Sequence, residues 1–315
     1  MSDTSAKQLA ELVDPLVVTP GAKVTLATDY DPGSRAGWLK KKEGKEHLQL
    51  TVELLSEYQE RLAAQNTYGV LVVLQALDAA GKDGTIRHVM SGVNPQGVEV
   101  HSFKVPSEEE LDHDYLWRYA RRLPARGQIG IFNRSHYEEV LVVRVHPHLL
   151  ERQHLPESSR GGEVWKRRYQ EINNWERYLT DNGFRIVKLF LNVSREEQRR
   201  RFLKRIDRRE KNWKFSAADV TERGFWDDYQ RALSQMLSHT STAWAPWHVI
   251  PADHKWFARI AAGAVIARTL IDIDPRYPVV SPAELRALEE AGAKLEAEAP
   301  AGEPADPFAD GHAPT

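Results

Sequence analysis

The segment Gly69–Ala76 constrains the fold more than any other stretch of the chain. It reads GVLVVLQA, a short and nearly continuous run of valine and leucine. Such a run is typical of a parallel strand that helices cover on both faces, because neither of its faces is suited to water. The segment therefore predicts a buried strand of a parallel sheet.

Strand and helix patterns alternate after this strand. Further strands are expected at residues 97–105, 127–132, 184–193 and 247–250, and helices at about residues 40–64, 107–122, 165–180 and 255–270. Ser107 with Glu110, and Ser194 with Glu197, have the spacing of capping boxes that open helices. The alternation favours a three-layer α/β fold, with a mostly parallel sheet and helices on both faces.

The two ends of the chain differ in composition from its middle. Residues 1–35 mix short apolar stretches with proline and glycine, which predicts an extended arm that wraps the domain or a neighbouring subunit. Residues 36–290 are expected to form one domain. Residues 291–315 are rich in alanine, glutamate, proline and glycine with little to bury, and are predicted to be disordered.

Composition excludes several classes of protein. The 315 residues carry a formal net charge of only -2, so no global positive charge points to nucleic acid or to a membrane as partner. The chain has no cysteine, which removes disulfides and thiolate chemistry. No apolar run approaches the roughly 18 residues that span a bilayer, and the first residues lack a signal pattern. A cytoplasmic protein is expected.

A glycine loop follows the first strand directly, in the sequence LDAAGKDGT. Backbone N–H groups at such a turn, together with the following helix terminus, converge on phosphate oxygens, and a lysine there neutralises charge. The motif is imperfect, because Ala76 stands at the usual first glycine and Asp83 at the usual Ser/Thr. Spacing alone leaves phosphate binding and a plain strand-to-helix turn as equal alternatives.

A second group of polar residues follows the third predicted strand, and includes Asn133, Arg134 and Glu138. Ligands of open α/β sheets bind at the carboxyl ends of the strands, so these side chains are candidates for a site. Lys104, at the end of the second predicted strand, is a candidate for the same reason. Arg122 is either a site residue or a cation that favours the negative end of a helix dipole.

A cluster of arginines lies between residues 199 and 211. Arg201, Arg205 and Arg208 have the i, i+4, i+7 spacing of one helix face, where like charges repel each other. Either a bound polyanion removes this repulsion, or the face is solvated and paired with nearby glutamates. Because the rest of the chain is near neutral, we expect a lid over phosphates at about residues 199–225.

Other residue types are assigned structural roles. The twelve histidines include no second ligand pair at zinc spacing, so they are expected at the surface. The nine tryptophans are expected mostly in packing between helices and the sheet.

Several longer segments carry a resemblance to a known family. The runs LDAAGKDGT, SGVNPQGVEVHSFKVP, GIFNRSHYEEVLVVRV, WDDY and APWHVIPAD resemble the polyphosphate kinase 2 family in order and spacing, over roughly residues 36–275. The chain is most similar to the branch called class III, whose members use nucleoside mono- and diphosphates. The resemblance implies a P-loop kinase core with a helical lid, with Asp78 through Thr85 as its Walker A region.

The resemblance also implies an activity and its cofactor. It implies reversible, Mg2+-dependent phosphoryl transfer between inorganic polyphosphate and AMP or ADP, giving ADP or ATP, by a homo-oligomer (dimer or tetramer). Much of the family has Asp where this chain has Asn133, so Asp78 and Glu138 are expected to hold Mg2+. The alternatives are a nucleoside-monophosphate kinase that uses ATP, and a non-catalytic module that binds polyanions or nucleic acid.

The resulting candidate site has three parts. The catalytic residues are expected to be Asp78, Lys82, Asn133, Arg134 and Glu138. Phosphate and nucleotide are expected to contact Ala79, Ala80, Gly81, Asp83, Gly84, Thr85, Asn94, Lys104 and Arg122. Polyphosphate is expected to contact Arg201, Arg205 and Arg208 on the lid.

Overall fold

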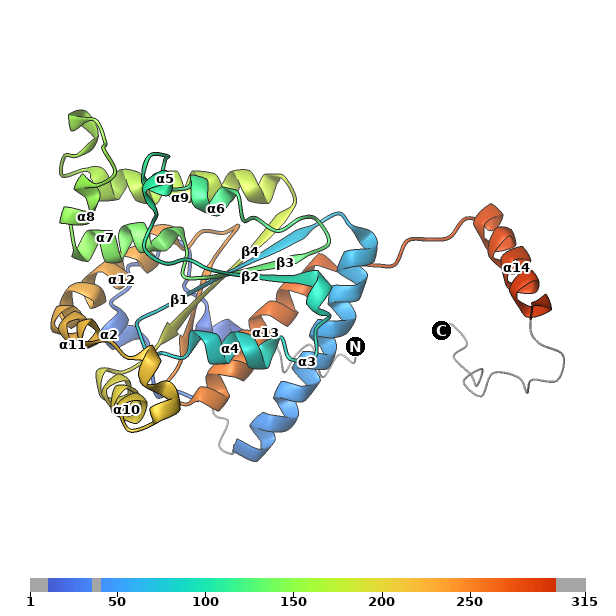
Figure 1. Cartoon of the computed structure of the whole chain (residues 1–315), viewed down its shortest axis with the longest axis horizontal. Helices are drawn as coiled ribbons and strands as arrows, with labels where there is room; N and C mark the ends of the chain where they lie inside the picture. Colours follow the sequence, from blue (N-terminus) through green and yellow to red (C-terminus); the bar gives the residue numbers. More distant parts are fainter. Residues whose placement is uncertain (1–10, 36–40, 299–315) are drawn as a thin grey trace. The chain divides into compact units, whose positions relative to one another are not determined.

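The computed structural model describes residues 11–35 and 41–298 (Figure 1). Contacts divide the chain into two compact units, Met1–Arg276 and Tyr277–Thr315. The first unit contains the sheet and nearly all of the helices, and the second contains one helix. None of the helices in the described ranges is both long enough and apolar enough to cross a membrane.

Five parallel strands form one sheet in the order β2-β3-β1-β4-β5. Their bounds are β1 Gly69–Ala76, β2 Val98–Ser102, β3 Ile129–Asn133, β4 Phe184–Asn192 and β5 Trp247–Pro251. All carboxyl ends therefore lie at the same edge. The chain leaves β1 towards β2 on one side and leaves β4 towards β5 on the other, so a ligand crevice is expected at the carboxyl end of β1.

Helices cover both faces of the sheet, as the sequence predicts (Figure 1). On one face, α3 (Lys41–Gln65), α4 (Lys82–Val89) and α13 (Lys255–Ile273) bury a cluster that includes Leu55 and Phe257. On the other face, α9 (Val164–Asp181) and α12 (Trp226–Thr240) bury a second cluster. The α/β three-layer architecture is confirmed.

Short helices make up most of the connections. Their bounds are η1 Asp14–Leu16, α2 Leu26–Asp29, η2 Pro95–Gly97, α5 Glu108–Leu111, α6 Trp117–Ala120, η3 His136–Val140, α7 Val142–Val145, α8 His148–Glu151 and η4 Glu157–Ser159. Those that follow β4 are α10 Arg195–Ile206, η5 Arg209–Lys214, α11 Ala217–Glu222 and η6 Arg223–Phe225. The second unit contains α14 Pro282–Ala297.

The amino-terminal segment is built into the first unit where it is described. Leu16 belongs to one core cluster and Leu26 to the other. Val17 forms an antiparallel bridge with His248 of β5, and the Val18 N–H donates to the Trp247 carbonyl at 2.8 Å. The segment is extended in part and helical at η1 and α2; residues 1–10 and 36–40 lie outside the described ranges.

Two predicted elements differ from the structure. The helix expected over residues 107–122 is two short helices, although its capping box at Ser107 and Glu110 is present. It breaks because the Asp114 carboxylate accepts the N–H of Leu116 at 2.9 Å, a local turn that competes with a continuous helix. Residues 291–297, predicted to be disordered, belong to α14, which a capping box at Ser281 opens; residues 299–315 lie outside the described ranges.

Candidate functional site

The loop after β1 has the backbone of a phosphate-binding turn. Ala79 has φ +62° and Gly81 has φ +115°, so the chain passes twice through left-handed conformations before α4 begins at Lys82. For Ala79 this conformation costs about 1 kcal/mol or more, and it persists only where surrounding contacts hold it. The amino terminus of α4 follows this turn directly at the carboxyl edge of the sheet, and N–H groups of a helix amino terminus favour anions.

Lys82 lies among the charges at this edge. Its ammonium donates to the Ala76 carbonyl at 2.7 Å. Burial lowers the pKa of Lys82, while the negative charge of Asp78 raises it. The predicted lysine of the loop is thus close to the predicted carboxylates.

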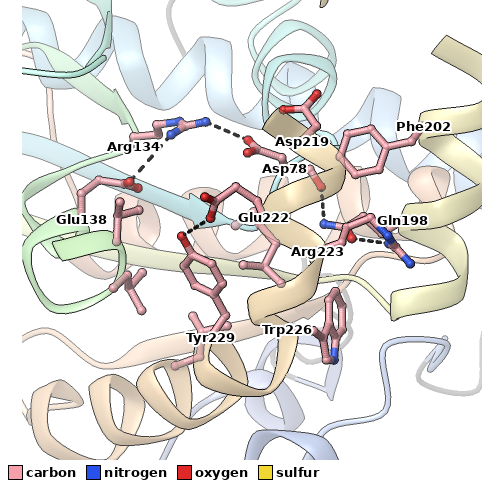
Figure 2. A pocket seen from close by; sticks show the side chains of 15 residues that line it. Asp78, Arg134, Glu138, Gln198, Phe202, Asp219, Glu222, Arg223, Trp226 and Tyr229 are labelled. Atoms are coloured by element: carbon pink, nitrogen blue, oxygen red, sulfur yellow. Dashed lines mark hydrogen bonds and ion pairs between the residues drawn. The ribbon is translucent and has the colours of Figure 1, made fainter. Parts of the chain in front are cut away.

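Arg134 joins the two carboxylates that the sequence singled out. Its guanidinium contacts Asp78 Oδ1 at 2.7 Å and Glu138 Oε2 at 3.8 Å (Figure 2). Burial raises the pKa of Glu138, and the charges of Arg134 and Lys82 oppose that change. The structure therefore brings Asp78, Arg134 and Glu138 together at the ends of β1 and β3.

Asn133 connects the two loops. Its side-chain amide donates to Asp83 Oδ1 at 3.0 Å and to Ser102 Oγ at 3.4 Å. Asn133 thus contacts the P-loop helix through an acid of that helix. An amide in this position serves as a donor, which a carboxylate could not do.

A buried network supports the loop that carries Arg134 and Glu138. The Tyr137 hydroxyl donates to Glu176 at 2.7 Å, and the Lys188 ammonium donates to Glu176 at 2.6 Å and to Tyr137 at 2.9 Å. Burial opposes ionisation of Glu176, but the Lys188 charge lowers its pKa; burial lowers the pKa of Lys188, and the Glu176 charge opposes that change. Because one partner alone would be an uncompensated buried charge, this network fixes the loop strongly.

The lid adds acids that the sequence analysis missed. Asp219 and Glu222 of α11 line the same pocket as Asp78 and Glu138 (Figure 2). Burial raises the pKa of Asp219, and the nearby Asp78 charge raises it further. Glu222 accepts hydrogen bonds from the Tyr229 hydroxyl at 2.9 Å and His146 Nε2 at 3.1 Å. The capping spacing of Ser216 and Asp219 could have indicated a helix here, but not its direction towards the crevice.

The predicted arginine face is wrong in two respects. Arg201 is only 4% exposed, and its guanidinium donates to backbone carbonyls of the P-loop and of the segment after β5. Helix α10 ends at Ile206, so Arg208 lies beyond the face that the spacing assumed. Arg205 is half-buried and its charge opposes the rise that burial causes in the pKa of Asp219, while Arg208 is exposed.

Of the predicted site residues, Asp78, Arg134 and Glu138 line the pocket, whereas Ala79 to Thr85, Asn133, Arg201, Arg205 and Arg208 do not. Three further predicted residues also lie outside it. They are Asn94, Lys104 and Arg122, and all of them are exposed. The Asn94 side chain accepts the N–H of Gln96 at 3.0 Å, which caps η2. Lys104 follows β2, the edge strand, and β3 separates β2 from β1.

The donors at this edge fit Mg2+. Carboxylate oxygens are its preferred protein ligands, and in phosphoryl-transfer sites one or two carboxylates suffice because phosphates and water complete the shell. Asp78 and Glu138 supply such oxygens within one pocket. Within residues 11–35 and 41–298 no group of three or more acidic or histidine side chains has metal-site geometry.

Comparison with known proteins gives a consistent result. The family model described as polyphosphate kinase 2 matches residues 38–277. An ADP-polyphosphate phosphotransferase of Rhodopseudomonas palustris is 53% identical over 78% of this chain and 87% of its own length. An AMP/ADP-polyphosphate phosphotransferase of Meiothermus ruber is 47% identical over 71% of this chain and 80% of its own length. The crystal structure of polyphosphate kinase 2 from Arthrobacter aurescens TC1 superposes with a TM-score of 0.77 at 40% identity, covering 86% of this chain and 94% of that one.

Proposed function

The chain belongs to the polyphosphate kinase 2 family, and from this premise we propose that it transfers phosphoryl groups reversibly between inorganic polyphosphate and nucleoside mono- and diphosphates. One observation on this chain's own residues supports the proposal. A P-loop with its lysine faces the Asp78–Arg134–Glu138 group at the carboxyl ends of β1 and β3. The relatives named for ADP and for AMP/ADP support AMP and ADP as acceptors and ADP and ATP as products.

The transfer needs positioning and charge neutralisation more than proton transfer. The loose transition state of phosphoryl transfer spreads negative charge over the oxygens of the moving group. Lys82 and the N–H groups at the start of α4 supply positive potential for that charge. The acceptor phosphate is already ionised at neutral pH, so no general base is required and transfer is direct and in line.

We assign Mg2+ to Asp78 and Glu138. When bound, Mg2+ neutralises phosphate oxygens and orients the reacting groups. Arg134 holds both carboxylates in place through its two contacts, and Asn133 keeps the P-loop helix next to β3. These residues therefore orient the site from the side opposite the lid.

The lid closes over the phosphates and excludes water. We propose that polyphosphate contacts Arg205 and Arg208. Arg205 lies close to the lid carboxylate Asp219. Arg208 is exposed just beyond α10. Residues Asp78 to Thr85 contact the reacting phosphoryl group. We propose that Asn94, Lys104 and Arg122 are outer contacts for a long polyphosphate chain that extends beyond the pocket.

The setting of the enzyme is part of the proposal. Absence of cysteine supports the cytoplasm. Membership of the family supports a homo-oligomer, a dimer or tetramer. The near-neutral net charge supports partners other than nucleic acid or membranes.

The test is incubation with long-chain polyphosphate, Mg2+ and either AMP or ADP, followed by chromatographic separation of the nucleotides. Formation of ADP from AMP and of ATP from ADP, dependent on polyphosphate, is expected. A parallel reaction with ATP and AMP in place of polyphosphate separates an ordinary nucleoside-monophosphate kinase. Phosphorylation with ATP as the only effective donor would contradict the proposal, and binding of polyphosphate without turnover would indicate a non-catalytic module.

A further inference from the structure

One face of α10 contacts three successive carbonyls of the P-loop. The Gln198 amide donates to the Asp78 carbonyl at 3.0 Å. One nitrogen of Arg201, Nη1, donates to the Ala79 carbonyl at 3.1 Å and to the Ala80 carbonyl. Both side chains are 4% exposed, so these bonds are shielded from water.

The Arg201 guanidinium has no donor left for a substrate. An arginine side chain has five N–H donors. The acceptors in the structure are Glu197 Oε1 (2.8 Å), the carbonyls of Ala79 (3.1 Å) and Ala80, and the carbonyls of Ala252 (2.5 Å) and Asp253 (3.1 Å). Arg201 thus joins the P-loop to the segment after β5. Its planar, forked geometry is needed for this, and a lysine could not reproduce it.

Carbonyl direction determines where the loop's N–H groups point. In a trans peptide the N–H lies opposite the preceding carbonyl, and the chain has no cis peptide in its described part. Because the carbonyls of Asp78 and Ala80 point to α10, the N–H groups of Ala79 and Gly81 point away from it. The Ala79 residue between them is in the left-handed conformation, which needs such external contacts to persist.

The same face also reaches the lid. The Gln198 side-chain oxygen accepts from Arg223 Nη1 at 2.5 Å, while its nitrogen donates to the P-loop (Figure 2). Arg223 lines the pocket and begins η6. One glutamine therefore connects a lid residue to the backbone of the P-loop.

We propose that Gln198 and Arg201 are positioning residues that hold the P-loop backbone at Asp78–Ala80 in the conformation for phosphoryl transfer. Arg201 lies outside the pocket, whereas Gln198 is in its lining; both are proposed to act through their bonds to the loop. This inference rests on the proposed function for its kinetic consequence. Its structural consequence, a P-loop fixed by α10, holds independently of which phosphates react.

The test compares Arg201→Lys and Gln198→Leu with wild type, with Arg199→Met as a matched control on the exposed face of the same helix. Kinetic constants are measured with polyphosphate and ADP at two salt concentrations, and amide hydrogen exchange is followed in residues 76–84. A misplaced loop is expected to lower kcat by about 10- to 100-fold in both variants, with both KM values within about twofold. P-loop exchange should accelerate while β1 and β4 stay protected, and Arg199→Met should behave as wild type.

Two results would overturn the inference. One is a kcat within about twofold of wild type in Arg201→Lys together with unchanged P-loop exchange. The other is a raised KM for polyphosphate at unchanged kcat, which identifies a substrate contact. If Arg201→Lys does not fold, the same criteria of kcat, KM for polyphosphate and P-loop hydrogen exchange are applied to Gln198→Leu. If wild type itself shows no transfer, the proposed function fails, and hydrogen exchange alone still decides whether α10 holds the loop.

Discussion

The P-loop edge and the lid are built in different ways. At the edge, Asp78–Ala80 are held by buried donors of α10, and the loop after β3 is fixed by the buried Glu176–Lys188 pair. In the described part of the lid that follows α10, α11 and η6 bury no side chain, and Trp213 and Val220 are 78% and 59% exposed. Elements with few buried contacts open most easily. We therefore expect the transfer geometry to be preformed and movement to be concentrated in the part of the lid after α10.

The largest effect is expected from the centre of the preformed edge. Lys82→Ala removes the ammonium that neutralises the transferred group, so kcat should fall on the order of 10³-fold. The fold should be retained, because the side chain makes one hydrogen bond to a carbonyl. Product nucleotides are measured by chromatography and folding by circular dichroism. Substantial activity in a folded variant would remove Lys82 from the mechanism.

The carboxylates of the edge come next. Asp78→Asn should lower kcat about 100-fold, because it removes a metal ligand and the Arg134 ion pair. Asn133→Ala should cost less than about tenfold, and Asn133→Asp should cost more than Asn133→Ala, because its carboxylate has no proton to donate to Asp83. Steady-state kinetics across Mg2+ concentrations rank the three variants. The opposite ranking would mean that Asn133 holds the ion.

The buried charges of the edge predict a narrow pH profile. Burial raises the pKa of Glu138, so its carboxylate is lost as pH falls through a higher value than for an ordinary glutamate. Burial lowers the pKa of Lys82, so its charge is lost as pH rises through a lower value than for an ordinary lysine. The profile of kcat/KM, which reports the free enzyme, should therefore fall early on both sides.

One variant tests whether Lys82 is the group that titrates on the alkaline side of that profile. Lys82→Arg keeps its charge at high pH, so the alkaline limb should move upwards even if the maximum is lower. An alkaline limb that stays in place would assign it to a different group.

The smallest effect is expected from the lid. Replacing Arg205 and Arg208 by alanine together should raise KM for polyphosphate by about two- to fivefold per arginine, with a shallower dependence on salt. The KM for ADP should change little. Kinetics at two salt concentrations measure both. An unchanged KM for polyphosphate would mean that these arginines lie on a solvated face and do not contact the substrate. A large loss of kcat would mean that the lid contributes to the transfer step as the edge does.

Prediction from sequence succeeded where a single pattern of apolar residues determines the position of a strand in the sheet. The Val/Leu run of β1 is buried whichever side it faces, so it identifies a central strand, and the turn that follows it has to lie at the carboxyl edge. The same argument placed Asn133, Arg134 and Glu138 at that edge. It failed for Lys104, since strand order across the sheet is not encoded in the pattern of one strand.

The roles of the α10 residues could not be predicted in the same way. Spacing shows that Arg201 and Arg205 share a helix face, but it does not show that carbonyls of two distant loops meet that face. An arginine that binds backbone and one that binds phosphate look alike in sequence. Asp219 and Glu222 were missed because their place in the pocket depends on the tertiary position of α11, which spacing in the sequence does not give.

The most direct test of the account is transfer of label from 32P-polyphosphate to unlabelled ADP, followed on the time scale of one turnover. Direct in-line transfer at the P-loop predicts label in ATP at the rate at which polyphosphate loses it. No label should remain on the denatured protein, and no transfer should occur with Lys82→Ala. Label bound covalently to the protein and then passed to ADP would contradict direct transfer at this edge of the sheet.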